Sequence, residues 1–296
     1  MTQQSPRRRK RFLPLLVLVS LLLLTLLAFS EALRTVRYTI ETDKVTAPVR
    51  LVLLTDLHSC YYGEEQEQLI RAIRKAEPNF ICLAGDIFDD KTAHQGTMDL
   101  LDGIADHYPC YYVTGNHEHW SDEVTILNAL LASYDVTVLA GDTSLLTFGE
   151  QTLTVSGIDD PTGFPEEGTP GTPDPDTWYG QLAMAEESIS ASPYFHILLS
   201  HRPERTAEYS ASPFDLVLCG HAHGGQIRIP FLLNGLFAPN QGYFPKYAGG
   251  EYTLDDTAMI VSRGLCRNDL PRVCNRPELV VVDIVPGETG YTAQKS

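Results

Sequence analysis

The chain of 296 residues contains 43% hydrophobic and 20% charged residues, which is ordinary for a globular protein with a large core. Its formal net charge of −16 argues against a nucleic-acid partner, because such a partner requires a basic protein face. The basic residues at positions 7–11 leave the remainder more acidic still, so an anionic substrate would need cations at its site.

The N-terminal part is predicted to be a membrane anchor. Residues 1–11 form a basic tail, and residues 12–30 form an uncharged, leucine-rich segment near the lower length limit for a transmembrane helix. Positive charge before the span predicts that the N-terminus lies inside and the body outside the cytoplasmic membrane. Small residues near Ala28 and Ala32 also permit cleavage, so a cleaved signal is the alternative. Residues 31–48 are interpreted as a linker.

The body, residues 49–290, is predicted to be one domain in which strands and helices alternate. In its first half we expect strands at residues 49–55, 80–85, 110–115 and 136–139, and helices at residues 66–76, 97–107 and 121–134. Ser121 is a plausible N-cap of the last of these helices. In the second half we expect a helix at residues 178–190 and strands at residues 152–158, 195–200, 214–219, 258–262 and 278–285. This alternation is typical of βαβ units and a largely parallel central sheet.

Side chains that can bind metal ions follow five of these strands. In chain order they are Asp56, His58, Asp86, Asn116, His201, His221 and His223. Because ligands bind beyond the carboxyl ends of strands in open α/β sheets, we expect these side chains to converge on one crevice. Each short motif alone is also typical of a simple strand-end turn, but five in this order favour a metal site. Carboxylate, imidazole and amide donors suit Mn, Fe or Zn.

We expect these residues to hold two divalent metal ions. The first ion is assigned to Asp56, His58, Asp86 and His223, and the second to Asp86, Asn116, His201 and His221. Asp86 would then bridge the two ions, as in the two-metal clamp of phosphoryl hydrolases, where the ions lie about 3.5–4 Å apart. Residues 220–226 read GHAHGGQ, and two histidines one residue apart on an extended segment point the same way.

Three further residues are candidates for roles in the reaction. His117 follows the predicted ligand Asn116 and can face the phosphate as a transition-state stabiliser or as the proton donor to the leaving oxygen. The alternative is that His117 only stabilises the turn. Asp89 is predicted to hydrogen-bond His117 and fix its orientation. Arg202 either contacts a substrate phosphate or pairs with an acid.

Three other features leave alternatives open. Residues 159–177 are rich in Pro and Gly, and they form either a mobile connector or a rim that shapes substrate access. The apolar stretch 231–237 either lines a groove for lipid or packs in the core. The six cysteines form no CxxC pair; Cys266 and Cys274 are the nearest pair in sequence, but no particular disulfide is expected.

The ordered motifs DxH, GDxxD, GNHE, SHRPE and GHAHGGQ resemble those of the calcineurin-like metallophosphoesterase superfamily, over roughly residues 49–286. The stretch GHAHGGQIRIPFLLNGLFAPNQGYFPKY, followed by SRGL, is similar to the bacterial membrane-associated branch. Some relatives in that family hydrolyse UDP-2,3-diacylglucosamine. The resemblance implies an α/β fold, a four-layer α/β/β/α sandwich, and it also implies the metal assignment given above. No ligand position is missing, which disfavours an inactive copy.

The sequence therefore predicts a dinuclear metal-dependent phosphoesterase that acts on phosphate esters or pyrophosphates at the outer surface of the cytoplasmic membrane. A lipid or lipid-linked substrate fits the predicted anchor, whereas a soluble nucleotide or phosphomonoester fits a permissive site. The alternative is a non-catalytic metal-binding surface module, and the complete ligand set argues against it.

Overall fold

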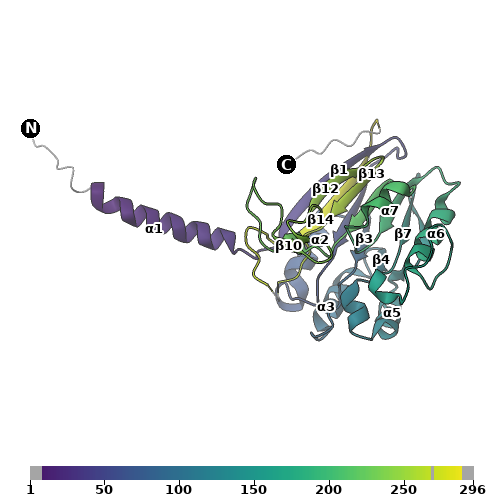
Figure 1. Cartoon of the computed structure of the whole chain (residues 1–296), viewed down its shortest axis with the longest axis horizontal. Coiled ribbons are helices and arrows are strands. Elements are labelled where there is room, and N and C mark those ends of the chain that lie inside the picture. The colour runs from purple at the N-terminus through teal and green to yellow at the C-terminus, as the bar shows by residue number, and fades with distance from the viewer. Residues whose placement is uncertain (1–8, 268–269, 289–296) are drawn as a thin grey trace, which may run out of the picture.

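The computed structural model describes residues 9–267 and 270–288, which form two facing β-sheets with helices on their outer faces (Figure 1). The strands of the first sheet are, in spatial order, β1 (Arg34–Thr42), β14 (Glu278–Pro286), β2 (Val49–Leu54), β3 (Phe80–Ala84), β4 (Cys110–Val113) and β5 (Thr137–Val138). Neighbouring strands are parallel except for β14 and β2. The run from β2 to β5 is the predicted parallel arrangement.

The second sheet also has six strands. In spatial order they are β12 (Gly250–Leu254), β13 (Thr257–Val261), β9 (Leu216–Cys219), β8 (Phe195–Leu199), β7 (Gln151–Gly157) and β6 (Thr143–Phe148). The four inner strands are parallel, and an antiparallel strand closes each edge. A small separate hairpin joins β10 (Phe237–Ala238) to β11 (Gly242–Tyr243).

Helices cover the outer face of each sheet and complete four layers. Against the first sheet pack α2 (Glu67–Ala76), α3 (Gln95–Ile104) and α5 (Val124–Ser133). Against the second sheet pack α6 (Trp178–Ile189) and α7 (Thr206–Ala211). A third apolar cluster fills the space between the sheets. The predicted α/β/β/α sandwich is therefore confirmed.

The central strands form because both of their faces are covered. Each of β3, β4, β8 and β9 is buried along its whole length, between the other sheet and the outer helices. Strands buried on two sides are continuous apolar runs, not alternating ones. This is why such runs could be located in the sequence to within a residue or two.

Two predicted segments differ from the structure. Residues 31–48, which the sequence predicts to be a linker, contain β1, because Val36, Tyr38 and Ile40 alternate along an extended strand that adds to β14. The helix predicted to begin at Ser121 begins instead at Val124. Ser121 is instead the C-cap of the short helix α4 (Asn116–Trp120).

Helix α1 (Arg9–Ala28) projects away from the body (Figure 1), and the large apolar side chains from Leu15 to Leu27 are exposed. Within the described residues, no helix meets the length and apolarity needed to cross a bilayer, so the predicted transmembrane span is not found there. Most of the predicted basic tail, residues 1–11, lies outside the described residues.

Candidate metal centre

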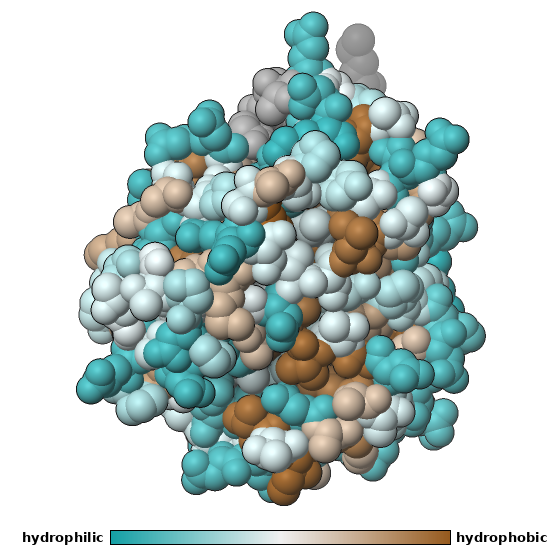
Figure 2. All heavy atoms as spheres, turned by 90° about the vertical axis from the view of Figure 1, so that its right-hand side faces the viewer, coloured by the Kyte–Doolittle hydropathy of each residue, from teal (hydrophilic) through white to brown (hydrophobic). Residues whose placement is uncertain are grey.

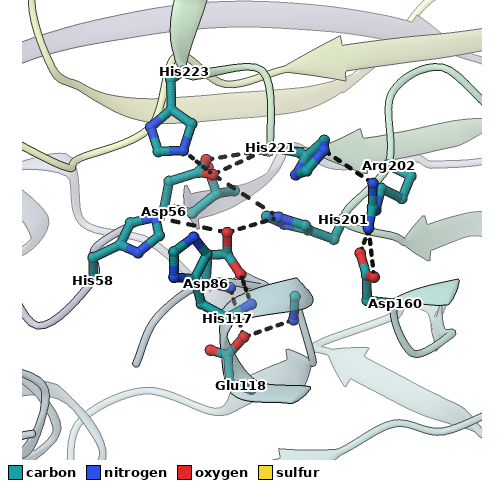
Figure 3. A network of polar contacts seen from close by, with 12 residues as sticks. Asp56, His58, Asp86, His117, Glu118, Asp160, His201, Arg202, His221 and His223 are labelled. Carbon is teal, nitrogen blue, oxygen red and sulfur yellow. Dashed lines mark hydrogen bonds and ion pairs between the residues drawn. The ribbon is translucent and has the colours of Figure 1, made fainter. Parts of the chain in front are cut away.

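The seven predicted ligands follow closely after the carboxyl ends of β2, β3, β4, β8 and β9. Figure 3 shows that the labelled members of this set, from both sheets, point toward one shared space. All seven side chains are buried or nearly so. The crevice expected from the strand ends is therefore present.

The residues predicted for the first ion lie together. One nitrogen or carboxylate oxygen from each of Asp56, His58, Asp86 and His223 lies within 4.8 Å of the others. His223 Nε2 is 3.5 Å from Asp56 Oδ1, and His58 Nε2 is 3.6 Å from Asp86 Oδ2. These atoms could hold one cation among them.

Three residues of the second predicted set also lie together. The ligand atoms of Asp86, His201 and His221 are within 4.8 Å of one another, so Asp86 belongs to both groups. His201 Nε2 lies 3.1 Å from Asp86 Oδ2, and His201 Nδ1 donates to the carbonyl of Ala84 at 2.9 Å. That hydrogen bond places the ring proton on Nδ1 of the neutral imidazole and leaves Nε2 available for a metal ion. The fourth member, Asn116, is the first residue of α4 and is buried.

The centre contains buried polar atoms that have no hydrogen-bond partner among the described residues. Three of them are His58 Nε2, Asp86 Oδ2 and His201 Nε2, and Asn116 Oδ1 is a fourth. The two imidazole nitrogens approach Asp86 Oδ2 without hydrogen-bond geometry. Buried polar atoms are nearly always paired in folded proteins, so three such atoms on residues of the two groups that share Asp86 indicate a missing partner. Carboxylate, amide and imidazole donors together fit divalent cations.

The electrostatics of the centre also favour cations. Burial opposes the protonated form of His58, but the carboxylates of Asp89 and Asp86 outweigh burial and raise its pKa to about 9. The carboxylates thus attract positive charge. Burial lowers the pKa of His221 to about 4 and that of His223 to about 3, so both rings are neutral and can offer a lone pair to a metal ion.

Five of the candidate ligands have left-handed backbones. The φ angles of Asp56, His58, Asp86, His221 and His223 lie between 46° and 64°. Non-glycine residues in this region cost of order 1–3 kcal/mol each and are concentrated at functional sites. Backbone hydrogen bonds between the loops after β2 and β3 hold this arrangement, since Asp56 N donates to Gly85 O and His58 N to Asp86 O, each at 3.0 Å.

The arrangement of His117 differs in part from the prediction. His117 Nδ1 lies 3.3 Å from Asp89 Oδ1, as expected, but only 2.7 Å from Asp90 Oδ1. Asp89 Oδ1 is equally close to His58 Nδ1, at 3.3 Å. Asp90 is therefore the nearer partner of His117, while Asp89 lies between His117 and a candidate ligand. The sequence DD at this position gave no basis for choosing between the two acids.

Glu118 was not singled out from the sequence. Its buried carboxylate accepts backbone N–H groups from Asp86, Ile87, Phe88 and Gly115 at 2.8–3.0 Å. Glu118 thereby fixes the loop that carries Asp86. Burial, with a further contribution from Asp86, raises its pKa to about 7. The signal that could have identified it is GNHE, in which a Glu follows a helix N-cap position by three residues, as in a capping box.

The structure decides between the two predicted roles of Arg202 in favour of pairing with an acid. Its Nε and Nη2 donate to the two carboxylate oxygens of Asp160 at 2.5 and 2.8 Å, and Nη2 also donates to Thr162. Asp160 and Thr162 lie near the start of the Pro- and Gly-rich segment. Arg202 therefore connects this segment to the candidate ligand His221, whose Nε2 lies 3.0 Å from Arg202 Nη1. Asn240 Oδ1, not predicted from sequence, lies 2.8 Å from His221 Nε2 and also accepts from Arg202.

A cavity of about 140 Å³ opens beside the centre. It is lined by His58, His117, His223, Gln226, Pro239, Cys266, Leu270 and Arg272. Arg272 is buried, and its Nε and Nη1 donate to the carbonyls of Cys266 and Arg263 at 2.7 Å. Its Nη2 has no hydrogen-bond partner among the described residues. None of the six cysteines, all of which are described, is in a disulfide.

Residues 49–225 match the sequence model of a family described as calcineurin-like phosphoesterase. The chain belongs to this family. The matched range contains all seven candidate ligands, and it confirms the resemblance inferred from the motifs. Members of the family use two divalent metal ions, and this phosphoesterase is accordingly a metal-dependent phosphoric ester hydrolase.

Two curated relatives cover most of the phosphoesterase. It is 28% identical over 239 residues to "Uncharacterized metallophosphoesterase YkuE" of Bacillus subtilis, and the alignment covers 78% of this chain and 77% of the relative. It is 26% identical over 245 residues to "Phosphodiesterase YaeI" of Escherichia coli, covering 81% of this chain and 83% of the relative. Among solved structures, Haemophilus influenzae NAD nucleotidase aligns with a TM-score of 0.48 and 16% identity, over 74% of this chain and 45% of that one.

Proposed function

We propose that this phosphoesterase hydrolyses phosphodiester or pyrophosphate bonds with two divalent metal ions held around Asp86. The observation that carries the proposal is that two ligand groups, each within 4.8 Å, share this one carboxylate. The name of the Escherichia coli relative, a phosphodiesterase, favours a diester among the possible substrates.

The metal ions, when bound, would activate a water molecule and neutralise charge on the phosphate. Asp86 would face both ions, while Glu118 holds its loop in place. His117 would hold the proton for the leaving oxygen at Nε2, because Nδ1 is directed at Asp90. Arg272 would contact a phosphate oxygen that takes no part in bond breaking. Its Nη2 has no hydrogen-bond partner in the described part of the chain, and its side chain lines the same cavity as His117.

We also propose that the enzyme acts at the outer surface of the cytoplasmic membrane and that its substrate is a lipid or a lipid-linked phosphate ester. The support is the exposed apolar surface of α1 together with the basic residues at positions 7–11. A soluble nucleotide or phosphomonoester is the competing substrate class.

Hydrolysis of two chromogenic esters tests the proposal. We expect the purified protein to hydrolyse bis-p-nitrophenyl phosphate when manganese is added and to lose this activity when the metal is removed with a chelator. p-Nitrophenyl phosphate should be the poorer substrate if the site prefers diesters. Absence of turnover of both esters, with metal demonstrably bound, would instead favour a non-catalytic metal-binding module.

A further inference from the structure

A second cavity, of about 500 Å³, shares no lining residue with the cavity at the metal centre. Its lining includes Arg34, Arg228 and Arg263, together with the apolar segment from Ile229 to Leu233. None of the described lining residues is acidic, although the chain as a whole carries a net charge of −16. Three arginine residues around one cavity of an acidic protein indicate an anionic ligand.

The positive charge in this cavity is only partly neutralised. Arg228 donates to two uncharged acceptors, the Gly224 carbonyl at 3.2 Å and Asn234 Oδ1 at 2.5 Å. Burial, and then the nearby Arg263, lower the pKa of Arg228 to about 10. Arg263 Nε lies 3.5 Å from Glu278 Oε2, so this arginine is paired with a carboxylate. An anion in the cavity would compensate the charge that is left.

An apolar hairpin tip forms one wall of this cavity. Ile229 and Leu233 exchange backbone hydrogen bonds at 3.0 and 2.8 Å, and the tight turn between them exposes Phe231 completely and Leu232 by 80%. The stretch 231–237 therefore does not pack in the core at this tip. Phe231 has a φ of 67°, which is unusual for a bulky residue. A large exposed apolar tip of this kind marks an interaction site.

The cavity also lies where α1 leaves the body. Cys274, which lines the cavity, donates its backbone N–H to the carbonyl of Ala28, the last residue of α1, at 2.6 Å. Arg276 donates to the carbonyls of Ala32 and Leu33 just beyond the helix. The exposed apolar surface of α1 therefore begins next to the three arginines. The face of the body on the other side from α1 carries mainly hydrophilic and intermediate residues, with small apolar groups among them (Figure 2).

We propose that this cavity binds the phosphate head group of an anionic membrane phospholipid, with Phe231 and Leu232 entering the apolar layer beside it. Guanidinium groups match a phosphate, and the hairpin tip matches acyl chains, so the two halves of the cavity fit the two halves of one amphiphile. The proposal rests on the proposed action at a membrane, and it adds a lipid site distinct from the metal centre.

Lipid binding by the full-length protein in detergent tests this site. Native mass spectrometry would compare dioctanoyl-phosphatidylglycerol with dioctanoyl-phosphatidylcholine, after chelation has removed metal so that the catalytic centre does not contribute. We expect at least tenfold tighter binding of the anionic lipid. Arg34→Gln and Arg228→Gln should each weaken it by about fivefold, as expected for a basic group near an anionic head group. Arg34→Lys, which keeps the charge, and Arg71→Gln, at an exposed residue that does not line this cavity, should bind as the wild type does.

Phe231→Ser combined with Leu232→Ser provides a second test that leaves the arginines intact. This variant should lose affinity for the dioctanoyl lipid while its thermal unfolding midpoint stays unchanged, because both side chains are exposed. Equal affinity for the two lipids, displacement of the lipid by an equal concentration of inorganic phosphate, or unchanged binding in Arg34→Gln and Arg228→Gln would overturn the proposal. Hydrolysis of bis-p-nitrophenyl phosphate by Arg34→Gln should equal that of the wild type, so failure of the lipid site is distinguishable from failure of the proposed activity.

Discussion

The pair of adjacent acids, Asp89 and Asp90, shows how closely neighbouring residues can divide their roles in this centre. Asp90 is the nearer partner of His117, whereas Asp89 also contacts His58 and accepts the backbone N–H of Thr92 at 2.8 Å. Asp90 is thus placed to orient a proton donor, and Asp89 to orient a metal ligand. The hydrogen bonds and the charge of His58 lower the pKa of Asp89 against its burial, which keeps it ionised.

Substituting each acid by Asn should separate these roles. We expect Asp90→Asn to lower kcat by about 10–100-fold with KM little changed, because His117 loses the partner that orients it. The loss should be larger for an alkyl leaving group than for p-nitrophenol, which needs less protonation. Asp89→Asn should instead weaken metal binding, measured by titration with a metal-ion indicator. The same kinetic effect from both substitutions would contradict this division.

The sequence was sufficient to locate the seven candidate ligands because each follows an apolar strand. The sequence was not sufficient to identify residues that reach the centre through tertiary contacts. Glu118 reaches four backbone amides in and around the Asp86 loop, and Asn240 meets His221 from a segment with no strong pattern of its own. Arg272 enters the cavity from beyond β13. Such contacts depend on tertiary distances that no short motif encodes.

Among the elements, β1 is the one that the sequence concealed. An edge strand has one bonded neighbour, so its residues do not form a continuous apolar run, and the pattern of RTVRYTIET does not distinguish this strand from a linker. In the structure Ile40 is fully buried and packs in the core between the sheets. Alternation of Val36, Tyr38 and Ile40 was the available signal.

Replacing Ile40 by Ala distinguishes a core strand from a linker. We expect Ile40→Ala to lower the free energy of unfolding by about 2–4 kcal/mol, because it leaves a cavity in the core. The exposed neighbour substitution Thr35→Ala should change it by less than about 0.5 kcal/mol. Urea denaturation of both variants measures the difference, and equal stability would mean that residues 34–42 do not belong to the folded body.

A buried histidine in β8 makes the stability of the second sheet depend on pH. His196 Nε2 donates to the carbonyl of Ser192 at 3.2 Å, so Nδ1 is free to accept the hydroxyl proton of Thr154 at 2.7 Å. This pairing requires the neutral ring, and burial lowers the pKa of His196 below its ordinary value of 6.5. The unfolded chain therefore binds the proton more tightly than the folded chain.

Acid is expected to destabilise the folded protein through His196. The stability that neutral His196 contributes is present above pH 6.5 and is lost as pH falls from there toward the lowered pKa of the folded state. Between pH 7 and pH 5 the urea midpoint of the metal-free wild type should therefore fall more than that of His196→Gln. His107→Gln, at an exposed position, should behave as the wild type. A steeper fall for His196→Gln would contradict the assignment.

At the scale of the whole molecule, the metal centre joins the two sheets. The first sheet contributes Asp56, His58, Asp86 and Asn116 through its strand-end loops, and the second contributes His201, His221 and His223. Two metal ions that bind only when both sheets are in place should stabilise the folded state by mass action. The shared carboxylate of Asp86 is the part of this arrangement on which both ions depend.

Metal content per chain tests most directly whether Asp86 bridges two metal ions. The protein would be equilibrated with excess manganese or zinc, freed of unbound metal, and analysed by inductively coupled plasma mass spectrometry. We predict two ions per chain for the wild type and for the exposed control Asp106→Asn, and fewer than one for Asp86→Asn, because the substitution removes a ligand from both ions. One ion or none in the wild type, or two ions retained by Asp86→Asn, would contradict the assignment of a dinuclear centre bridged by Asp86.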